Sequence, residues 1–111
     1  MMEYFGEKIR DLRIERDLPL RKVAAYLDID TSILSKIERG ERDANRELVI
    51  KAANFFNIEE KDFLTNFYSD QVAKILYQEN NCETILKVAE EKIKYIKENS
   101  LIQGKLGFEN E

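Results

Sequence analysis

The stretch DTSILSKIERGER, residues 30–42, carries the strongest fold signal in this sequence. Asp30 is a favourable helix N-cap and Gly40 is a common residue just past a helix end, so the stretch predicts a helix over 31–39. Its apolar residues recur at helical spacing: Ile33, Leu34 and Ile37. The side chains expected to face outward are hydrogen-bonding types, and none is a bulky hydrophobe: Thr31, Ser32, Ser35, Lys36 and Arg39. This pattern predicts one face buried in a core and one polar face turned to a partner.

A second helix is predicted just before this one, over residues 20–27. Pro19 precedes it, as proline often does at helix starts, and only a short turn at Asp28 and Ile29 follows it. Ala24 is small where two crossing helices approach closely, and Ile29 is an apolar plug for the corner. Two helices joined in this way form a helix-turn-helix. The second helix has a width that fits the major groove of DNA, where hydroxyls and lysine meet base edges.

The whole chain is predicted to be helical, so the expected fold class is all-α. It has one proline and four glycines, and no run of residues alternates at period two as a strand would. The expected helices are 5–16, 20–27, 31–39, 46–56, 59–67, one capped by Ser69 or Asp70 and ending near 79, and 82–98. The end, NSLIQGKLGFENE (residues 99–111), is expected to be irregular.

Composition limits the classes of protein. A length of 111 residues suits one compact domain with an appendage, and 43% apolar residues are enough for a core. A single cysteine excludes an internal disulfide and fits a reducing cytosol. No targeting segment opens the chain and no apolar run approaches about 18 residues, so we expect a cytoplasmic protein without a membrane span. The sequence contains no histidine, the commonest general base and metal ligand, so no catalytic residue, metal site or cofactor is expected.

The charges divide the chain into two parts. The net charge is −4, but residues 1–58 hold 11 Lys and Arg against 11 Asp and Glu. Residues 59–111 hold 7 against 11 and account for the whole acidic excess. All seven arginines lie in the first part: Arg10, Arg13, Arg16, Arg21, Arg39, Arg42 and Arg46. Because the guanidinium group is the better ligand for phosphate and base edges, this concentration favours nucleic acid as the partner of the first part.

The stretch from Gly6 to Leu64 resembles the lambda-repressor/Cro-type helix-turn-helix family, also called XRE-like. The matching elements are IRDLR in the first helix, the Val-Ala pair in the second, and SKIERGER at the end of the third. The resemblance implies a five-helix lambda-repressor-like DNA-binding domain, which we expect over residues 1–68, with 31–39 as the recognition helix. It also implies double-stranded DNA as the partner, bound at a two-fold operator by a homodimer.

The resemblance also implies roles for single residues. The base-reading positions are Thr31, Ser32 and Lys36, with Ser35 beside them. The positions that hold the phosphate backbone are Arg42, Asn45 and Arg46. Arg39, at the end of the recognition helix, is expected from its outward position to bind phosphate as well. Arg13 and Glu38 are implied to form a partly buried, bidentate ion pair that locks the third helix to the first.

Two features depart from the family pattern. The family usually begins the second helix with a Ser, Thr or Asn cap and a glutamine that contacts the DNA backbone, whereas Pro19 and Leu20 stand here. Leucine cannot donate a hydrogen bond, so Arg21 or Lys22 is expected to replace part of this phosphate contact. Asp28 stands in place of the usual turn glycine, and aspartate tolerates a left-handed backbone better than most residues.

Residues 69–111 lie outside the resemblance and are expected to form a helical pair and a tail. The helix over 82–98 has one apolar stripe that includes the four residues expected at a homodimer interface: Ile85, Ala89, Ile93 and Ile96. Val88 and Tyr95 form a second stripe, which we expect to face the subunit's own core. Because one stripe suffices to pack on a small domain, two stripes favour a second partner. The two stripes could have the opposite roles, with Val88 and Tyr95 at the homodimer interface. The alternative to a homodimer is a pair of helices that only caps the core of the monomer.

These patterns together predict a sequence-specific, DNA-binding transcription regulator. The alternative is a protein-interaction module, or an antitoxin-like partner, with the same fold and little DNA binding. The negative net charge and Leu20 favour this alternative. An enzyme is disfavoured because no nucleophile stands at a suitable spacing from a base. No glycine-rich loop or concentrated polar cluster indicates a small-molecule ligand, and Cys82 is expected to be a buried core thiol.

Overall fold

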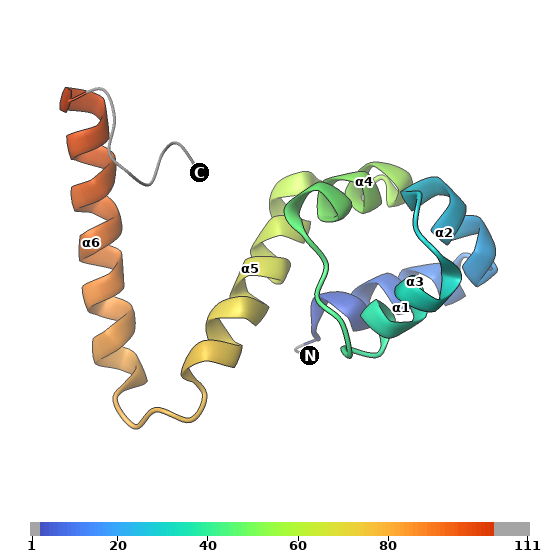
Figure 1. The fold of residues 1–111 in the computed structure, drawn as a ribbon, viewed down its shortest axis with the longest axis horizontal. Helices are drawn as coiled ribbons and strands as arrows, with labels where there is room; N and C mark the ends of the chain where they lie inside the picture. The colour runs from blue at the N-terminus through green and yellow to red at the C-terminus, as the bar shows by residue number, and fades with distance from the viewer. Residues whose placement is uncertain (1–2, 104–111) are drawn as a thin grey trace. The chain divides into compact units, whose positions relative to one another are not determined.

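The computed structural model describes residues 3–103, and these residues form six helices without a strand (Figure 1). The helices are α1 (Phe5–Glu15), α2 (Leu20–Leu27), α3 (Thr31–Glu38), α4 (Arg46–Phe56), α5 (Glu60–Leu76) and α6 (Cys82–Gln103). The all-α prediction is confirmed, and the first four helices begin at the residues expected from the sequence. The chain divides into two compact units, Met1–Lys74 and Ile75–Glu111, which are described separately below as unit 1 and unit 2.

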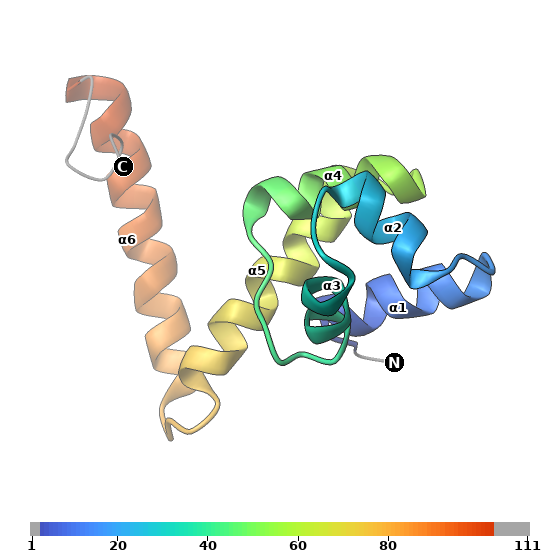
Figure 2. The same cartoon turned by 45° about the vertical axis from the view of Figure 1, so that its right-hand side comes forward.

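Unit 1 has one hydrophobic core, to which α1, α2, α3, α4 and α5 all contribute. In both views α3 lies against α1 and α2 (Figure 1, Figure 2). The fully buried large side chains are Phe56, Phe63, Ile9, Leu34, Val23 and Val49. Buried residues recur at helical spacing along α4, where they are Leu48, Val49, Ala52, Ala53 and Phe56, so this helix buries one face in the core. Ala24 is 2% exposed, as expected for a small residue at a close helix crossing.

The start of α1 is held by contacts with α5. The Phe5 ring meets the rings of Phe63 and Phe67 edge-on, at centroid distances of 5.4 and 5.9 Å. The backbone N–H of Phe5 donates to Asp70 Oδ2 over 2.7 Å. The first N–H groups of a helix have no partner within that helix, so Asp70 supplies an acceptor from a distant part of the chain.

Gly6 marks the closest approach of α1 to α3. A Cβ atom on Gly6 would lie 2.0 Å from the backbone oxygen of Ile37, far inside van der Waals contact. The missing side chain therefore allows the two helices to approach closely, which outweighs the low helix propensity of glycine at this position.

The first four helices end in the same way. A residue with a left-handed backbone follows each helix: Asp17, Asp28, Gly40 and Asn57, with φ of 55°, 59°, 77° and 58°. The next residue then returns its N–H to a carbonyl five positions earlier: Leu18 to Arg13, Ile29 to Ala24, Glu41 to Lys36 and Ile58 to Ala53, over 2.8–3.0 Å. This is the Schellman arrangement, and Asp28 takes the left-handed conformation expected of it.

The expected break between a helix ending at 67 and another starting at Ser69 or Asp70 is wrong, because α5 runs unbroken through this region. Ser69 and Asp70 are cap-forming residue types, but their side chains form other hydrogen bonds. Ser69 Oγ donates to the carbonyl of Asn66 over 2.9 Å, and Asp70 accepts the N–H of Phe5. No glycine or proline interrupts the helix. The expected domain boundary at 68/69 therefore falls inside α5, and unit 1 extends to Lys74.

Unit 2 contains the last two residues of α5, the turn after them and α6. The Cys82 thiol, at the first residue of α6, is 3.0 Å from the carbonyl oxygens of Leu76 and of Glu79, and the residue is half-buried. The helix extends to Gln103, so the expectation of irregular structure is wrong for residues 99–103, and 104–111 lie outside the described residues. None of the side chains described for α6 is buried.

Residues 3–103 contain neither a helix suited to span a membrane nor a cluster of metal-ligating side chains. Within that range, no helix combines the length and the apolar content needed to cross a membrane. No group of three or more His, Cys, Asp or Glu side chains in the same part of the chain could hold a metal ion.

Candidate nucleic-acid interface

The recognition helix predicted from the sequence is α3, and its inner face is anchored in the core. Leu34 is fully buried, Ile37 is 3% exposed, and Ile33 packs against the core from its edge. Ile29, in the turn after α2, is half-buried against the same core, as expected for a plug at the corner. The α2–turn–α3 segment therefore forms a rigid helix-turn-helix.

The outer face of α3 carries three of the four predicted base-reading side chains in exposed positions. Thr31, Ser32 and Lys36 are exposed, and Ser35 is half-buried. Within residues 3–103, Lys36 forms no ion pair. Hydroxyl and ammonium groups displayed on a rigid helix have the chemistry needed to meet base edges or phosphate.

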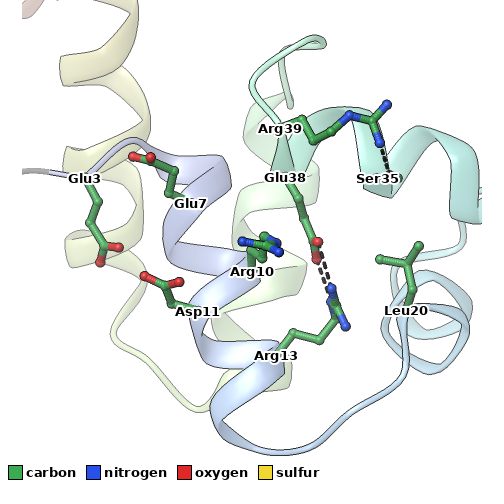
Figure 3. A pocket seen from close by; sticks show the side chains of 9 residues that line it. All are labelled: Glu3, Glu7, Arg10, Asp11, Arg13, Leu20, Ser35, Glu38 and Arg39. Atoms are coloured by element: carbon green, nitrogen blue, oxygen red, sulfur yellow. Dashed lines mark hydrogen bonds and ion pairs between the residues drawn. The ribbon is translucent and has the colours of Figure 1, made fainter.

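Arg13 and Glu38 form the predicted ion pair. Arg13 Nε lies 2.8 Å from Glu38 Oε2, and Nη2 lies 3.0 Å from Oε1, so the contact is bidentate (Figure 3). The two side chains are 16% and 4% exposed. The hydrogen bond from Arg13 to Glu38 raises the pKa of Arg13, against the opposing effect of desolvation. This pair joins α1 to the end of α3 and fixes the orientation of the recognition helix.

The carbonyl of Leu18 is a further contact of Arg13 that sequence reasoning missed. Arg13 Nη1 donates to this oxygen over 3.1 Å. Leu18 follows the left-handed residue at the end of α1, so its carbonyl is outside the helix and free to accept. No local sequence pattern marks a backbone oxygen as an ion-pair partner, which explains the omission.

The predicted phosphate-binding residues of the α3–α4 loop are all exposed. Asn45 caps α4, because its Oδ1 accepts the N–H of Leu48 over 2.9 Å. The Asn45 Nδ2 group, a donor, therefore remains available. Arg46 begins α4, and neither Arg46 nor Arg42 forms an ion pair within the part of the chain that the structure describes.

Arg39, at the end of α3, differs from the other predicted phosphate ligands. Its Nε and Nη2 groups lie 2.9 and 3.2 Å from the two carboxylate oxygens of Glu41. Its Nη1 group donates to Ser35 Oγ (Figure 3). Arg39 is therefore already paired, and it binds the hydroxyl of a predicted base-reading residue.

The start of α2 has the departure from the family pattern that the sequence indicated. Pro19 occupies the N-cap position, and no side chain caps the helix there. Leu20 is half-buried and packs against the core. Arg21 and Lys22 are exposed, and neither forms an ion pair among residues 3–103. Both remain candidates for the phosphate contact that Leu20 cannot make.

A hollow of about 610 Å³ lies beside the end of α3 (Figure 3). Its lining combines acids from the start of the chain with the residues around the Arg13–Glu38 pair: Glu3, Glu7, Arg10, Asp11, Arg13, Leu20, Ser35, Glu38 and Arg39. A hydrogen bond with Asp11 raises the pKa of Glu3, with smaller contributions from desolvation and from the negative charge of Asp11. The lining holds four acids and three arginines, so the hollow offers no concentrated positive charge to a phosphate group.

The residues predicted to contact DNA thus belong to unit 1, on α2, α3, the α3–α4 loop and the start of α4. Nine of the ten are exposed, and Ser35 is the half-buried one: Thr31, Ser32, Ser35, Lys36, Arg21, Lys22, Arg39, Arg42, Asn45 and Arg46. Their role in binding stays a prediction.

Curated proteins with related sequences are named as transcriptional regulators or repressors. The chain is 36% identical over 74 residues to the HTH-type transcriptional regulator DdrOP3 of Deinococcus deserti, covering 65% of this chain and 57% of that protein. It is 37% identical over 54 residues to the cryptic phage CTXphi transcriptional repressor RstR of Vibrio cholerae, covering 49% of each. The alignments therefore span about half the length of these relatives.

A solved structure and a family model agree with this similarity. The clp gene regulator ClgR from Corynebacterium glutamicum has the same fold, with a TM-score of 0.51 at 21% identity over 86% of this chain and 88% of that one. The family model described as helix-turn-helix matches residues 9–63, which extend from α1 into α5. Residues 9–63, about half of the chain, therefore form a helix-turn-helix domain of the Cro-type (XRE) family.

Proposed function

We propose that this protein is a cytoplasmic, sequence-specific DNA-binding transcription regulator that inserts α3 into the major groove. The observation that carries the proposal is the division of α3 into two faces. Leu34 and Ile37 bury one face in the core, and the Arg13–Glu38 pair fixes the end of the helix. The opposite face presents exposed hydroxyl and ammonium groups from a rigid support, as base reading requires.

The two classes of contact have different consequences for binding. Lys36 and the hydroxyls of Thr31 and Ser32 would meet base edges and select a sequence. Arg42, Asn45 and Arg46 would hold the phosphate backbone, which sets affinity and register but selects no sequence directly.

Selection of bound duplexes from a random pool tests this function directly. A recovered consensus motif is expected for the wild type. Lys36→Ala should weaken binding to that motif by about 1–3 kcal/mol and relax the preference at one base position per half-site. Arg46→Ala is the matched phosphate variant. It should weaken motif and random DNA alike and reduce the salt slope by about one unit.

Two results would contradict the proposal. If Lys36→Ala left the selected motif unchanged, α3 would not be the reading helix. Failure of the wild type to bind any duplex at about 20 mM salt, below the range in which such contacts normally weaken, would favour a protein-interaction module or an antitoxin-like partner.

We propose further that α6 makes a homodimer, so that two copies of α3 read a two-fold operator in successive major grooves about 34 Å apart. The support is the exposed apolar surface of this helix: Ile93 of the predicted interface is 52% exposed, and Leu86 is 47% exposed. Val88 and Tyr95, which were expected to face the subunit's own core, are 41% and 66% exposed, so that expectation is wrong and the second stripe is also open to a partner. Soluble monomers rarely leave such a surface uncovered. The other residues of the predicted interface are half-buried: Ile85, Ala89 and Ile96.

Light scattering of two variants tests the dimer and its stripe. Ile93→Asp lies on the predicted interface and should convert the dimer to a monomer of 13.1 kDa. Tyr95→Asp lies on the second stripe and should leave the mass unchanged. The reverse result would move the interface to the second stripe, and a monomeric wild type at tens of micromolar would reject the dimer.

A further inference from the structure

The end of α3 differs from the ends of α1, α2 and α4, although all four share one backbone arrangement. In α1, α2 and α4 the residue after the left-handed position is Leu18, Ile29 or Ile58, and each packs against the core. Such an apolar contact commonly accompanies this helix ending. In α3 the equivalent residue is Glu41, which is exposed.

The backbone fixes the place from which the Glu41 side chain leaves the chain. The N–H of Glu41 donates to the carbonyl of Lys36 over 2.8 Å, and the left-handed Gly40 reverses the chain direction just before it. This reversal brings Glu41 alongside Arg39, two residues earlier, although residues at this spacing on a continuous helix do not face each other.

Glu41 binds Arg39 in the manner of a phosphate. Two guanidinium nitrogens meet the two carboxylate oxygens, and this two-point geometry is also the one by which arginine holds phosphate. The pair is open to solvent, with side chains 52% and 55% exposed. The hydrogen bond with Arg39 lowers the pKa of Glu41, and Lys36 adds a smaller effect in the same direction. The carboxylate therefore lies within the electrostatic influence of two cations that are predicted to contact DNA.

The other predicted DNA-contacting cations are not occupied in this way. Across residues 3–103, ion pairs involve none of Arg21, Lys22, Lys36, Arg42 and Arg46. The second acid of the same loop, Asp43, pairs instead with Lys74 of α5 over 2.7 Å. Of the two acids in this loop, Glu41 is therefore the one that neutralises a predicted DNA ligand.

We propose that Glu41 is an intramolecular competitor of DNA for Arg39. In the free protein its carboxylate occupies the guanidinium group and holds it against Ser35. A DNA phosphate must displace Glu41 before Arg39 can join the interface and release the Ser35 hydroxyl for a base. This proposal rests on the proposed function, since it requires α3 to approach DNA. The consequence is that binding is weaker wherever a DNA phosphate does not displace Glu41 from Arg39.

A double-mutant cycle on the full chain tests the competition. The probe is a random-sequence duplex, and affinity is measured at several salt concentrations. Because the pair is exposed, Glu41→Gln should tighten binding by about two- to fivefold. It should also steepen the salt slope by about one unit, since Arg39 then neutralises one more phosphate. In an Arg39→Gln background the same change should have no effect on the slope and little effect on affinity.

Asp43→Asn is the matched control, because it removes an acid of the same loop that does not touch Arg39. Any gain it produces should be equal in the wild-type and Arg39→Gln backgrounds. If Glu41→Gln behaved like Asp43→Asn, with equal gains in both backgrounds, Glu41 would act by simple charge repulsion and the competition would be rejected. Unchanged melting temperatures would confirm that the variants are folded.

The design separates this proposal from the proposed function. If the wild type binds the duplex and loses affinity as salt rises, but Glu41→Gln binds no more tightly, the competition alone is overturned. If neither the wild type nor Glu41→Gln binds at about 20 mM salt, the DNA-binding function and the competition are both overturned.

Discussion

Units 1 and 2 both contain helices with an apolar face, but only unit 1 buries those faces in a core of its own. Phe56 and Ile9 in unit 1 are fully buried. In α6 of unit 2, Ile93 and Tyr95 are 52% and 66% exposed, and no described side chain is buried. Helical spacing thus identifies an apolar face equally well in both units. It does not identify what covers that face.

The difference also separates two sources of stability. The helices of unit 1 cover one another, so each buried side chain there contributes the full free energy of removal from water. The apolar residues of α6 gain little in the chain alone, and substitutions there should act mainly on assembly. The following substitutions test this contrast.

Removal of the Phe56 ring from the core should lower the free energy of unfolding more than any other change considered. Phe56→Ala should lower the free energy of unfolding by about 3–5 kcal/mol, because it leaves a cavity in a core without solvent access. Leu86→Ala in α6 is the matched change, and its side chain is 47% exposed, so a loss below about 1 kcal/mol is expected. Urea titration followed by circular dichroism measures both. Equal losses would show that α6 belongs to the same core as unit 1.

Loss of the buried ion pair should have the next largest effect. Glu38→Ala leaves the guanidinium of Arg13 poorly solvated and should cost about 2–4 kcal/mol. Glu47→Ala is the control, since its pair with Lys51 spans 3.8 Å and the Glu47 side chain is 82% exposed. That variant should lie within about 0.5 kcal/mol of the wild type. Similar melting curves for both variants would mean that the Arg13–Glu38 pair does not lock α3.

Adding one methyl group between α1 and α3 should have an intermediate effect. Gly6→Ala would place a Cβ atom against the backbone oxygen of Ile37, and the expected cost is about 1–3 kcal/mol. Helix propensity alone would favour alanine here by about 1 kcal/mol. The sign of the measured change therefore decides between crowding and propensity: a stabilised variant would show that the two helices can separate without loss.

Removal of unit 2 should have the smallest effect on the fold of unit 1. A chain ended after Lys74 keeps the Asp70–Phe5 and Lys74–Asp43 contacts, so its melting temperature should stay within about 4–8 °C of the wild type, equivalent to 1 kcal/mol or less. It should be monomeric by light scattering. A chain ended after Tyr68 loses both contacts and should melt lower. Failure of the longer fragment to fold would show that unit 1 depends on α6.

Local sequence patterns were sufficient to predict much of unit 1. Helix starts depend on residues close in the chain, and those of the first four helices were predicted correctly. Asp30 occupies the N-cap position of α3, although its side chain makes no cap hydrogen bond, and α1 and α3 each end one residue before the predicted position. The Arg13–Glu38 pair was predicted through the family resemblance, because its spacing is part of the family motif. Its bidentate geometry is confirmed by the structure.

The wrong helix break near residue 69 arose in part because a side chain there serves a distant part of the chain. Ser69 and Asp70 suggested a helix start, but Asp70 accepts a hydrogen bond from a residue 65 positions earlier. The pairing of Arg39 with Glu41 was missed for the opposite reason. The two residues are close in sequence, but only the left-handed backbone of Gly40 brings their side chains together. The base-reading and phosphate-binding assignments and the dimer stripe remain predictions.

The hydrogen bond from Phe5 to Asp70 has a consequence for the order of events during synthesis. On the ribosome α1 is made first, but its ring partners and its acceptor all lie on α5, the last helix of unit 1. Until α5 emerges, Phe5 lacks both the acceptor for its N–H and the two rings that cover its side chain. Unit 1 should therefore close late and in one step, and the interval before closure is when the new chain is most open to aggregation or to capture by a chaperone.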